Sequence, residues 1–116
     1  MYQGNHAIDI KSARSRVASI RKDREIPPLK AVEDLTACIE ILARRPFDYS
    51  LAEAFAIRGT AYARGMEDNQ SSFRDWRRAL GVIARQRESS PKLLNLAGQV
   101  RVQIAFHSEG PARIRN

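Results

Sequence analysis

The segment from Ser50 to Arg87 constrains the fold most, because it shows helical periodicity twice with a break between the two runs. Ser50 and Glu53 have the spacing of a capping box, which predicts a helix that begins at Ser50. Gly65 can take the left-handed conformation that closes a helix, and the Glu-Asp-Asn run at 67–69 offers acceptors to the next first turn. We therefore predict two helices that fold back on each other as an antiparallel pair.

The second of these helices is amphipathic, with an apolar face and a basic face. The residues expected in the core are Phe73, Trp76, Leu80 and Ile83. The arginines in the remaining directions are Arg74, Arg77, Arg78 and Arg85. Because Trp76 shares the register of the apolar face, we interpret it as a core residue and not as an exposed stacking platform.

Five residues of this segment resemble the signature of the tetratricopeptide repeat (TPR), a pair of antiparallel helices. They are Phe55, Gly59, Tyr62, Ser72 and Trp76. Two positions depart from the signature, namely Arg58, where the family has leucine, and Ala84, where it has proline. The resemblance implies an all-α fold of antiparallel helix hairpins stacked as a short TPR-like solenoid.

The N-terminal part of the chain is expected to form two more helices. The first covers residues 6–22, and its buried stripe consists of Ile10, Ala13, Val17 and Ile20. The Pro-Pro pair at 27–28 separates it from a helix over residues 29–44. Its expected core positions are Leu29, Val32, Leu35, Ile39 and Leu42. Ala31, Leu35, Cys38 and Ile39 resemble the second helix of the same repeat family, which implies an imperfect first repeat over residues 6–45. Pro46 is expected to end it.

A last helix is predicted over residues 90–107. Its apolar stripe consists of Leu93, Leu94, Ala97, Val100 and Ile104. The alternating apolar residues of 100–106 are also typical of a strand, but a lone strand would have no partner in a helical chain. We therefore predict a helix that ends before the Gly-Pro pair at 110–111, followed by a basic tail over 108–116.

The chain is thus predicted to be a single domain of about five helices, with 50–87 as the central repeat and 90–107 as a capping helix. Each repeat of this kind buries its apolar face only against its neighbours. A second copy of the chain could complete an imperfect cap, so a homodimer is an open alternative.

Composition restricts the class of protein. The length of 116 residues suits one domain with its own core. No stretch reaches the apolar length of a membrane span. The single cysteine, Cys38, permits no internal disulfide and fits a reducing compartment, so we expect a cytoplasmic location. The basic N-terminus also suits an organelle transit peptide, but we favour a helix that covers the domain.

No catalytic motif is apparent in the sequence. His6 and His107 lie near opposite ends of the chain and lack metal-ligand spacing to each other or to Cys38. No glycine-rich phosphate loop, HExxH motif or nucleophile elbow occurs. Cys38 lies on the apolar side of its helix, where a cysteine is typically a small buried hydrophobe. We therefore predict a non-enzymatic protein without a cofactor or metal.

The resemblance to the TPR family implies an adaptor or scaffold that binds a protein or peptide in a concave groove. The positions matching the groove are Glu53, Ala56, Thr60 and Arg64, followed by Lys92, Asn95, Gln99 and Gln103. The second set is a polar stripe that could hydrogen-bond an extended peptide, or equally an ordinary solvated face. The family's clamp for peptide C-termini is missing, because Ala56 and Thr60 occupy its positions.

The arginines at 74, 77, 78 and 85 support an alternative function, which is nucleic-acid binding along a basic ridge. The net charge of +7 is compatible with an anionic partner. A charge run of this kind is also typical of a solvated face, here partly neutralised by Asp75 and Glu88. Nucleic acid therefore ranks below a protein or peptide as the expected partner.

Overall fold

Over the residues that the structure describes, the chain folds into five α-helices and contains no strand. The computed structural model describes residues 3–44, 48–86 and 90–115, with side chains for 10–44, 48–86 and 90–108. The helices are α1 (Gln3–Lys22), α2 (Pro28–Leu42), α3 (Tyr49–Gly65), α4 (Asn69–Ala84) and α5 (Pro91–Arg115). The all-α prediction is therefore confirmed. Pro46, Arg87 and Glu88 lie outside the described residues.

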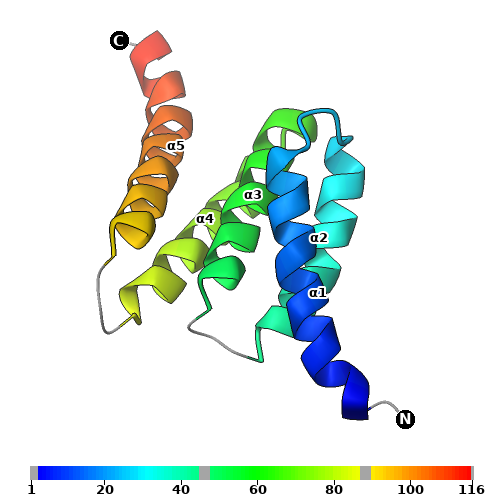
Figure 1. Cartoon of the computed structure of the whole chain (residues 1–116). Helices are drawn as coiled ribbons and strands as arrows, with labels where there is room; N and C mark the ends of the chain where they lie inside the picture. Colours follow the sequence, from blue (N-terminus) through cyan, green and yellow to red (C-terminus); the bar gives the residue numbers. More distant parts are fainter. Residues whose placement is uncertain (1–2, 45–47, 87–89, 116) are drawn as a thin grey trace.

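Helix α3 is the centre of the arrangement. Consecutive helices run antiparallel, and α3 and α4 share the most extensive contact, followed by α2 and α3 (Figure 1). Helix α3 also touches α1 and α5, which lie on either side of it and do not touch each other through their described residues. Residues 51–56 of α3 are accordingly all buried.

The start of α3 differs from the predicted capping box. Asp48 is the N-cap residue, and its Oδ1 accepts the Ser50 backbone N–H at 2.7 Å. Arg14 of α1 donates from Nε to Oδ2 of the same carboxylate at 2.8 Å. Glu53 is drawn instead to Arg21, with 2.8 Å between Oε2 and Nη1. The capping-box prediction is wrong because Asp48 supplies the cap and Arg21 competes for Glu53.

The turn between α3 and α4 also differs in detail. Gly65 does not adopt a positive φ, and the left-handed residue is Glu67, with φ of 51°. The backbone N–H groups of Met66 and Asp68 both donate to the Tyr62 carbonyl, at 3.2 and 3.0 Å. Asp68 then caps α4 by accepting the Ser71 backbone N–H at 3.0 Å, which confirms the expected acceptors at this helix start.

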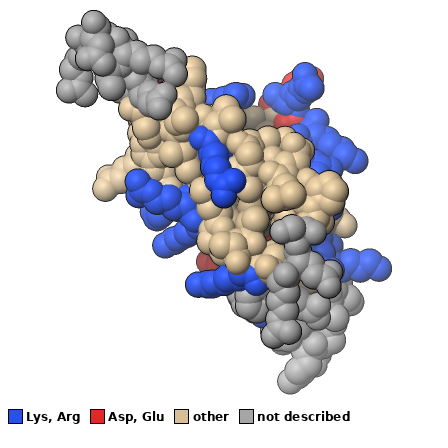
Figure 2. Space-filling model, turned by 90° about the vertical axis from the view of Figure 1, so that its left-hand side faces the viewer, with Lys and Arg blue, Asp and Glu red and all other residues tan. Residues whose placement is uncertain are grey.

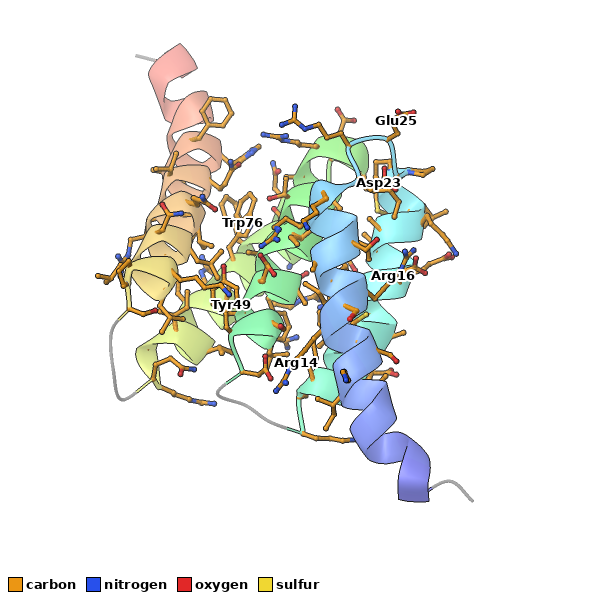
Figure 3. The ribbon with its side chains drawn as sticks, viewed as in Figure 1. Arg14, Arg16, Asp23, Glu25, Tyr49 and Trp76 are labelled. Atoms are coloured by element: carbon orange, nitrogen blue, oxygen red, sulfur yellow. The ribbon has the colours of Figure 1, made fainter. Side chains whose placement is uncertain are left out.

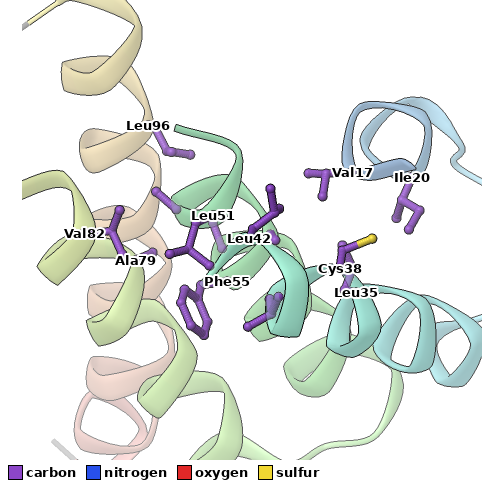
Figure 4. Close-up of a cluster of buried hydrophobic side chains, with 14 of the residues drawn as sticks. Val17, Ile20, Leu35, Cys38, Leu42, Leu51, Phe55, Ala79, Val82 and Leu96 are labelled. Atoms are coloured by element: carbon purple, nitrogen blue, oxygen red, sulfur yellow. The ribbon is translucent and has the colours of Figure 1, made fainter. Parts of the chain in front are cut away.

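The core is shared by all five helices. Val17, Leu35, Leu42, Trp76 and Val100 are fully buried, and they come from four different helices. The remaining helix, α3, contributes Leu51 and Phe55 to the same cluster (Figure 4). Three residues of the stripe predicted for the first helix are buried and the fourth, Ile10, is half-buried. The prediction that this helix covers the domain is therefore confirmed.

Two predicted core residues are exposed. Leu29 is 57% exposed and Leu94 is 61% exposed. Both lie in the first turn of their helices, immediately beside a loop. Leu94 is next to Leu93, and adjacent residues of a helix point about 100° apart, so only one of the two faces the core. The structure buries Leu93.

Helix α5 confirms the preference for helix over strand at residues 100–106. A period of two residues does not match a helical turn, so Val100 is buried whereas Val102 and Phe106 are 64% and 65% exposed. The helix continues to Arg115, so the predicted tail over 108–116 is wrong for its described residues. Pro111 removes one intrahelical hydrogen bond, which weakens the helix there without forcing the chain to leave it.

Close contact between α3 and α4 depends on Gly59. A Cβ atom at this position would lie 2.6 Å from Cδ1 and Nε1 of Trp76 and 3.1 Å from the Ser72 carbonyl oxygen. These distances are far below van der Waals contact. The absence of a side chain at Gly59 therefore allows the indole ring to rest on the backbone of α3.

We predict that Gly59→Ala lowers the free energy of unfolding by about 1–3 kcal/mol, as over-packing of a tight core does. Gly81→Ala is the matched control, because a Cβ at Gly81 meets nothing within 4 Å. The control should gain up to about 1 kcal/mol from better helix propensity. Urea unfolding of both variants measures this, and an equal effect of the two substitutions would contradict the proposed packing.

Candidate protein-binding groove

A groove of about 390 Å³ lies over α3, between α1 on one side and α5 on the other. Its lining comes from the end of α1 and the turn after it, the start of α2, the length of α3, Trp76 of α4, and α5. The residues from α3 and α5 are Glu53, Ala56, Ile57, Thr60, Ala61, Arg64, Leu96, Gln99, Val100 and Gln103. Asp23 marks the rim at the turn between α1 and α2 (Figure 3).

The floor of the groove is apolar. Ala56 and Ile57 of α3 lie in it, with Trp76 directly beneath. The indole ring has no exposed surface, and its Nε1–H donates to the Ala56 carbonyl at 3.3 Å. His107 of α5 lies against the same ring, with 5.3 Å between the ring centroids. The prediction that Trp76 belongs to the core is confirmed.

The groove gathers most of the residues predicted to bind a partner. Glu53, Thr60, Arg64, Gln99 and Gln103 all line it, as does Ala56. Lys92 and Asn95 do not. They lie in the first two turns of α5, before the stretch that faces the groove. Lys92 is placed instead with its Nζ 4.0 Å from the centroid of the Tyr49 ring.

The lining residues differ in whether they are free to meet a ligand. The Glu53 carboxylate is paired with Arg21, and the Thr60 hydroxyl donates to the Ala56 carbonyl at 3.2 Å. Arg64, Gln99 and Gln103 make no hydrogen bond or ion pair with other described residues. The groove therefore presents two free amides and one free guanidinium above an apolar floor.

The predicted basic ridge is exposed, and its four arginines share the face of α4 opposite the core. They are Arg74, Arg77, Arg78 and Arg85. Three of them lie about 6 Å from an aromatic centroid, Arg74 over Tyr62, Arg77 over Phe73 and Arg78 over Phe55. Asp75, expected to neutralise the ridge, is completely buried, because its main partner is Arg58. Only Arg74 also approaches it, at 3.6 Å.

Arg58 and Asp75 form a buried ion pair that the sequence analysis did not anticipate. Arg58 donates from Nε and Nη2 to the two carboxylate oxygens of Asp75, at 2.7 and 2.8 Å. Its Nη1 donates to the Thr36 hydroxyl of α2 at 3.0 Å. Burial disfavours the charge on Arg58, but the hydrogen bonds and the charge attraction to Asp75 together outweigh it and raise the Arg58 pKa. The sequence held one sign of this pair, because Arg58 stands where the TPR signature that it resembles has leucine.

Cys38 and the two histidines were also considered in the sequence analysis. Cys38 is buried, which confirms its expected place in the core, and burial raises the pKa of its thiol and disfavours the thiolate. Among the described residues, no three His, Cys, Asp or Glu side chains gather as a metal site would require. The side chain of His6 lies outside the described residues.

None of the described helices is both long enough and apolar enough to cross a membrane. Comparisons with protein-family models, curated proteins and solved structures produce no match to this chain.

We predict that Asp75→Asn lowers the free energy of unfolding by about 3–5 kcal/mol, because it leaves a buried guanidinium without a counter-charge. The double variant Arg58→Met with Asp75→Leu should be less destabilised than Asp75→Asn, since it removes both charges and keeps apolar volume. Urea unfolding of the variants measures the difference. Similar or greater destabilisation of the double variant would show that the charge pair is not the source of the effect.

Proposed function

We propose that this chain is a non-enzymatic, TPR-like adaptor that holds an extended peptide segment of another protein in the groove between α1 and α5. The groove itself carries the proposal. It gathers five of the seven predicted partner-binding residues on one surface, and these come from two helices that are separate in the sequence.

The order of helix contacts supports a TPR-like arrangement. Each helix packs against the next one, and α1, α3 and α5 also meet in succession. In such a stack the first helix of each hairpin lines one side of the molecule. Gly59 and Trp76 both match the TPR signature, and they are in close contact. Arg58 stands where that signature has leucine, and it is paired with Asp75.

The chemistry of the lining suits an extended peptide. The amides of Gln99 and Gln103 can donate to and accept from a peptide backbone, which makes such contacts independent of the peptide sequence. Ala56 and Ile57 offer an apolar surface for one side chain. Arg64 can pair with a carboxylate, so we propose a preference for a peptide with an acidic residue at that end.

We place this activity in the cytoplasm, because the free thiol of Cys38 suits a reducing compartment. A homodimer is the alternative partner arrangement under this proposal.

We predict that Gln99→Ala combined with Gln103→Ala raises the Kd of a groove-bound peptide about tenfold, since two hydrogen bonds of about 0.5–1.5 kcal/mol each are lost. The probe is a labelled peptide selected from a random display library on the immobilised chain, titrated by fluorescence anisotropy. Asn95→Ala is the matched control, because Asn95 is exposed on α5 outside the groove. Failure to select any peptide, or unchanged affinity of the double variant, would count against the groove.

Nucleic-acid binding along the arginine ridge is the second candidate function. It is favoured by the position of Asp75, which turns inward to Arg58 and leaves most of the ridge charge unopposed. The ring contacts under Arg74, Arg77 and Arg78 also hold these side chains on one exposed face.

If the ridge binds phosphates, affinity for a labelled single-stranded oligonucleotide should fall steeply with salt, with a slope of about −0.7 per contact. Arg77→Gln with Arg78→Gln should reduce that slope by about 1.4. Lys22→Gln with Arg24→Gln removes the same charge from exposed positions near the α1–α2 turn and should change it far less. Absence of binding at low salt, or equal effects of the two pairs, would remove this candidate.

A further inference from the structure

Helix α5 carries an apolar strip, with the exposed Asn95 at its edge, on the side opposite its buried residues. The strip consists of Leu94, Gly98, Val102, Ala105 and Phe106. Its three large side chains are each more than 60% exposed. At about 100° per residue these positions fall on one side of the helix, opposite the buried residues Leu93, Leu96, Ala97 and Val100. Exposed apolar surface of this extent on one element is typical of an interaction site.

The molecule itself shows how such a strip is covered. On α3, Phe55 and Gly59 are covered by α4, whose Trp76 rests on the glycine. Leu94 and Gly98 stand at the same spacing on α5. A Cβ at Gly98 would meet nothing within 4 Å, so the glycine that allows a close helix approach on α3 has an open counterpart on α5. The strip on α5 therefore resembles the face of α3 that α4 covers, but no described helix packs on it.

The charges beside the strip indicate what kind of helix fits. Arg101 is exposed on α5 beside the strip, whereas Lys92 points away from it and has its Nζ against the Tyr49 ring. Residues 91–108 contain no Asp or Glu, and Glu109 follows them. This face of the molecule is largely uncharged, with Lys and Arg side chains on and around it and the few visible acids near its edges (Figure 2). A second copy of the chain would bring a second Arg101 to the contact, which disfavours self-pairing of α5.

We propose that the apolar strip of α5 binds an amphipathic helix of another protein, which places a bulky apolar side chain over Gly98 and acidic residues beside Arg101. The contact is a helix packed on a helix, as α4 packs on α3. It uses a different surface from the groove, so it stands whether or not the groove binds a peptide.

The test uses two designed helical peptides on the full chain, measured by fluorescence anisotropy. Both carry leucines at i, i+3, i+4 and i+7 around one central tryptophan, with glutamates beside the apolar face in one peptide and lysines in the other. The glutamate peptide should bind at least about tenfold more tightly than the lysine peptide, and the difference should shrink as salt rises.

Gly98→Leu should raise the Kd of the glutamate peptide about tenfold, because the new side chain blocks close approach of the helix. The variant should melt at or above the wild-type temperature, since glycine within a helix is unfavourable. Gly81→Leu is the matched control, because Gly81 is equally open but lies on the arginine face of α4. Val102→Gln offers a second variant that weakens the apolar contact without filling the face.

Three results would overturn the proposal. The first is no binding of the glutamate peptide, or equal binding of the two peptides. The second is an equal loss of affinity in Gly81→Leu, which would place the peptide on the arginine ridge. The third is a dimer of the chain alone in sedimentation velocity that Gly98→Leu abolishes, because the occupant of the strip would then be a second copy.

Discussion

The buried ion pair between Arg58 and Asp75 is the constraint on which the arrangement of the central helices depends. Both charges lie away from water, so each must find its partner in the fold or incur a large desolvation cost. The planar guanidinium meets both oxygens of one carboxylate and, through Nη1, the Thr36 hydroxyl. Other registers of α3 and α4 would leave these charges buried without their partner, so the pair favours the register in which the helices pack.

The shape of the groove depends on the same interface between α3 and α4. Gly59 follows Arg58 directly, and its contact with Trp76 brings α4 against α3. The indole N–H of Trp76 donates to the Ala56 carbonyl of α3. Trp76 lines the groove beside Ala56 and Ile57, so the contact that joins α3 to α4 also shapes the floor of the groove. A preorganised surface loses less conformational entropy on binding, which favours a groove of modest size as a peptide site.

The surfaces of the molecule carry different chemistry. The groove combines free amides with an apolar floor, the α5 strip is apolar beside cations, and the α4 ridge is basic. These differences suit an extended peptide, an amphipathic helix and an anion, respectively. A chain of 116 residues can thus present separate contacts to separate partners, which is the behaviour proposed for an adaptor.

The sequence by itself determined the five helices and most of the core. The spacing of apolar residues and the prolines and loop residues that end helices are local properties, so they can be read without the fold. Only the tertiary structure decided where the polar residues went. Asp75 turned inward and Glu53 left its expected cap, because their arginine partners lie 17 and 32 residues away in the chain. For the same reason the groove includes Gln99 and Gln103 but not Lys92 and Asn95, since the path of α5 past α3 is set by packing between helices and no local pattern encodes it.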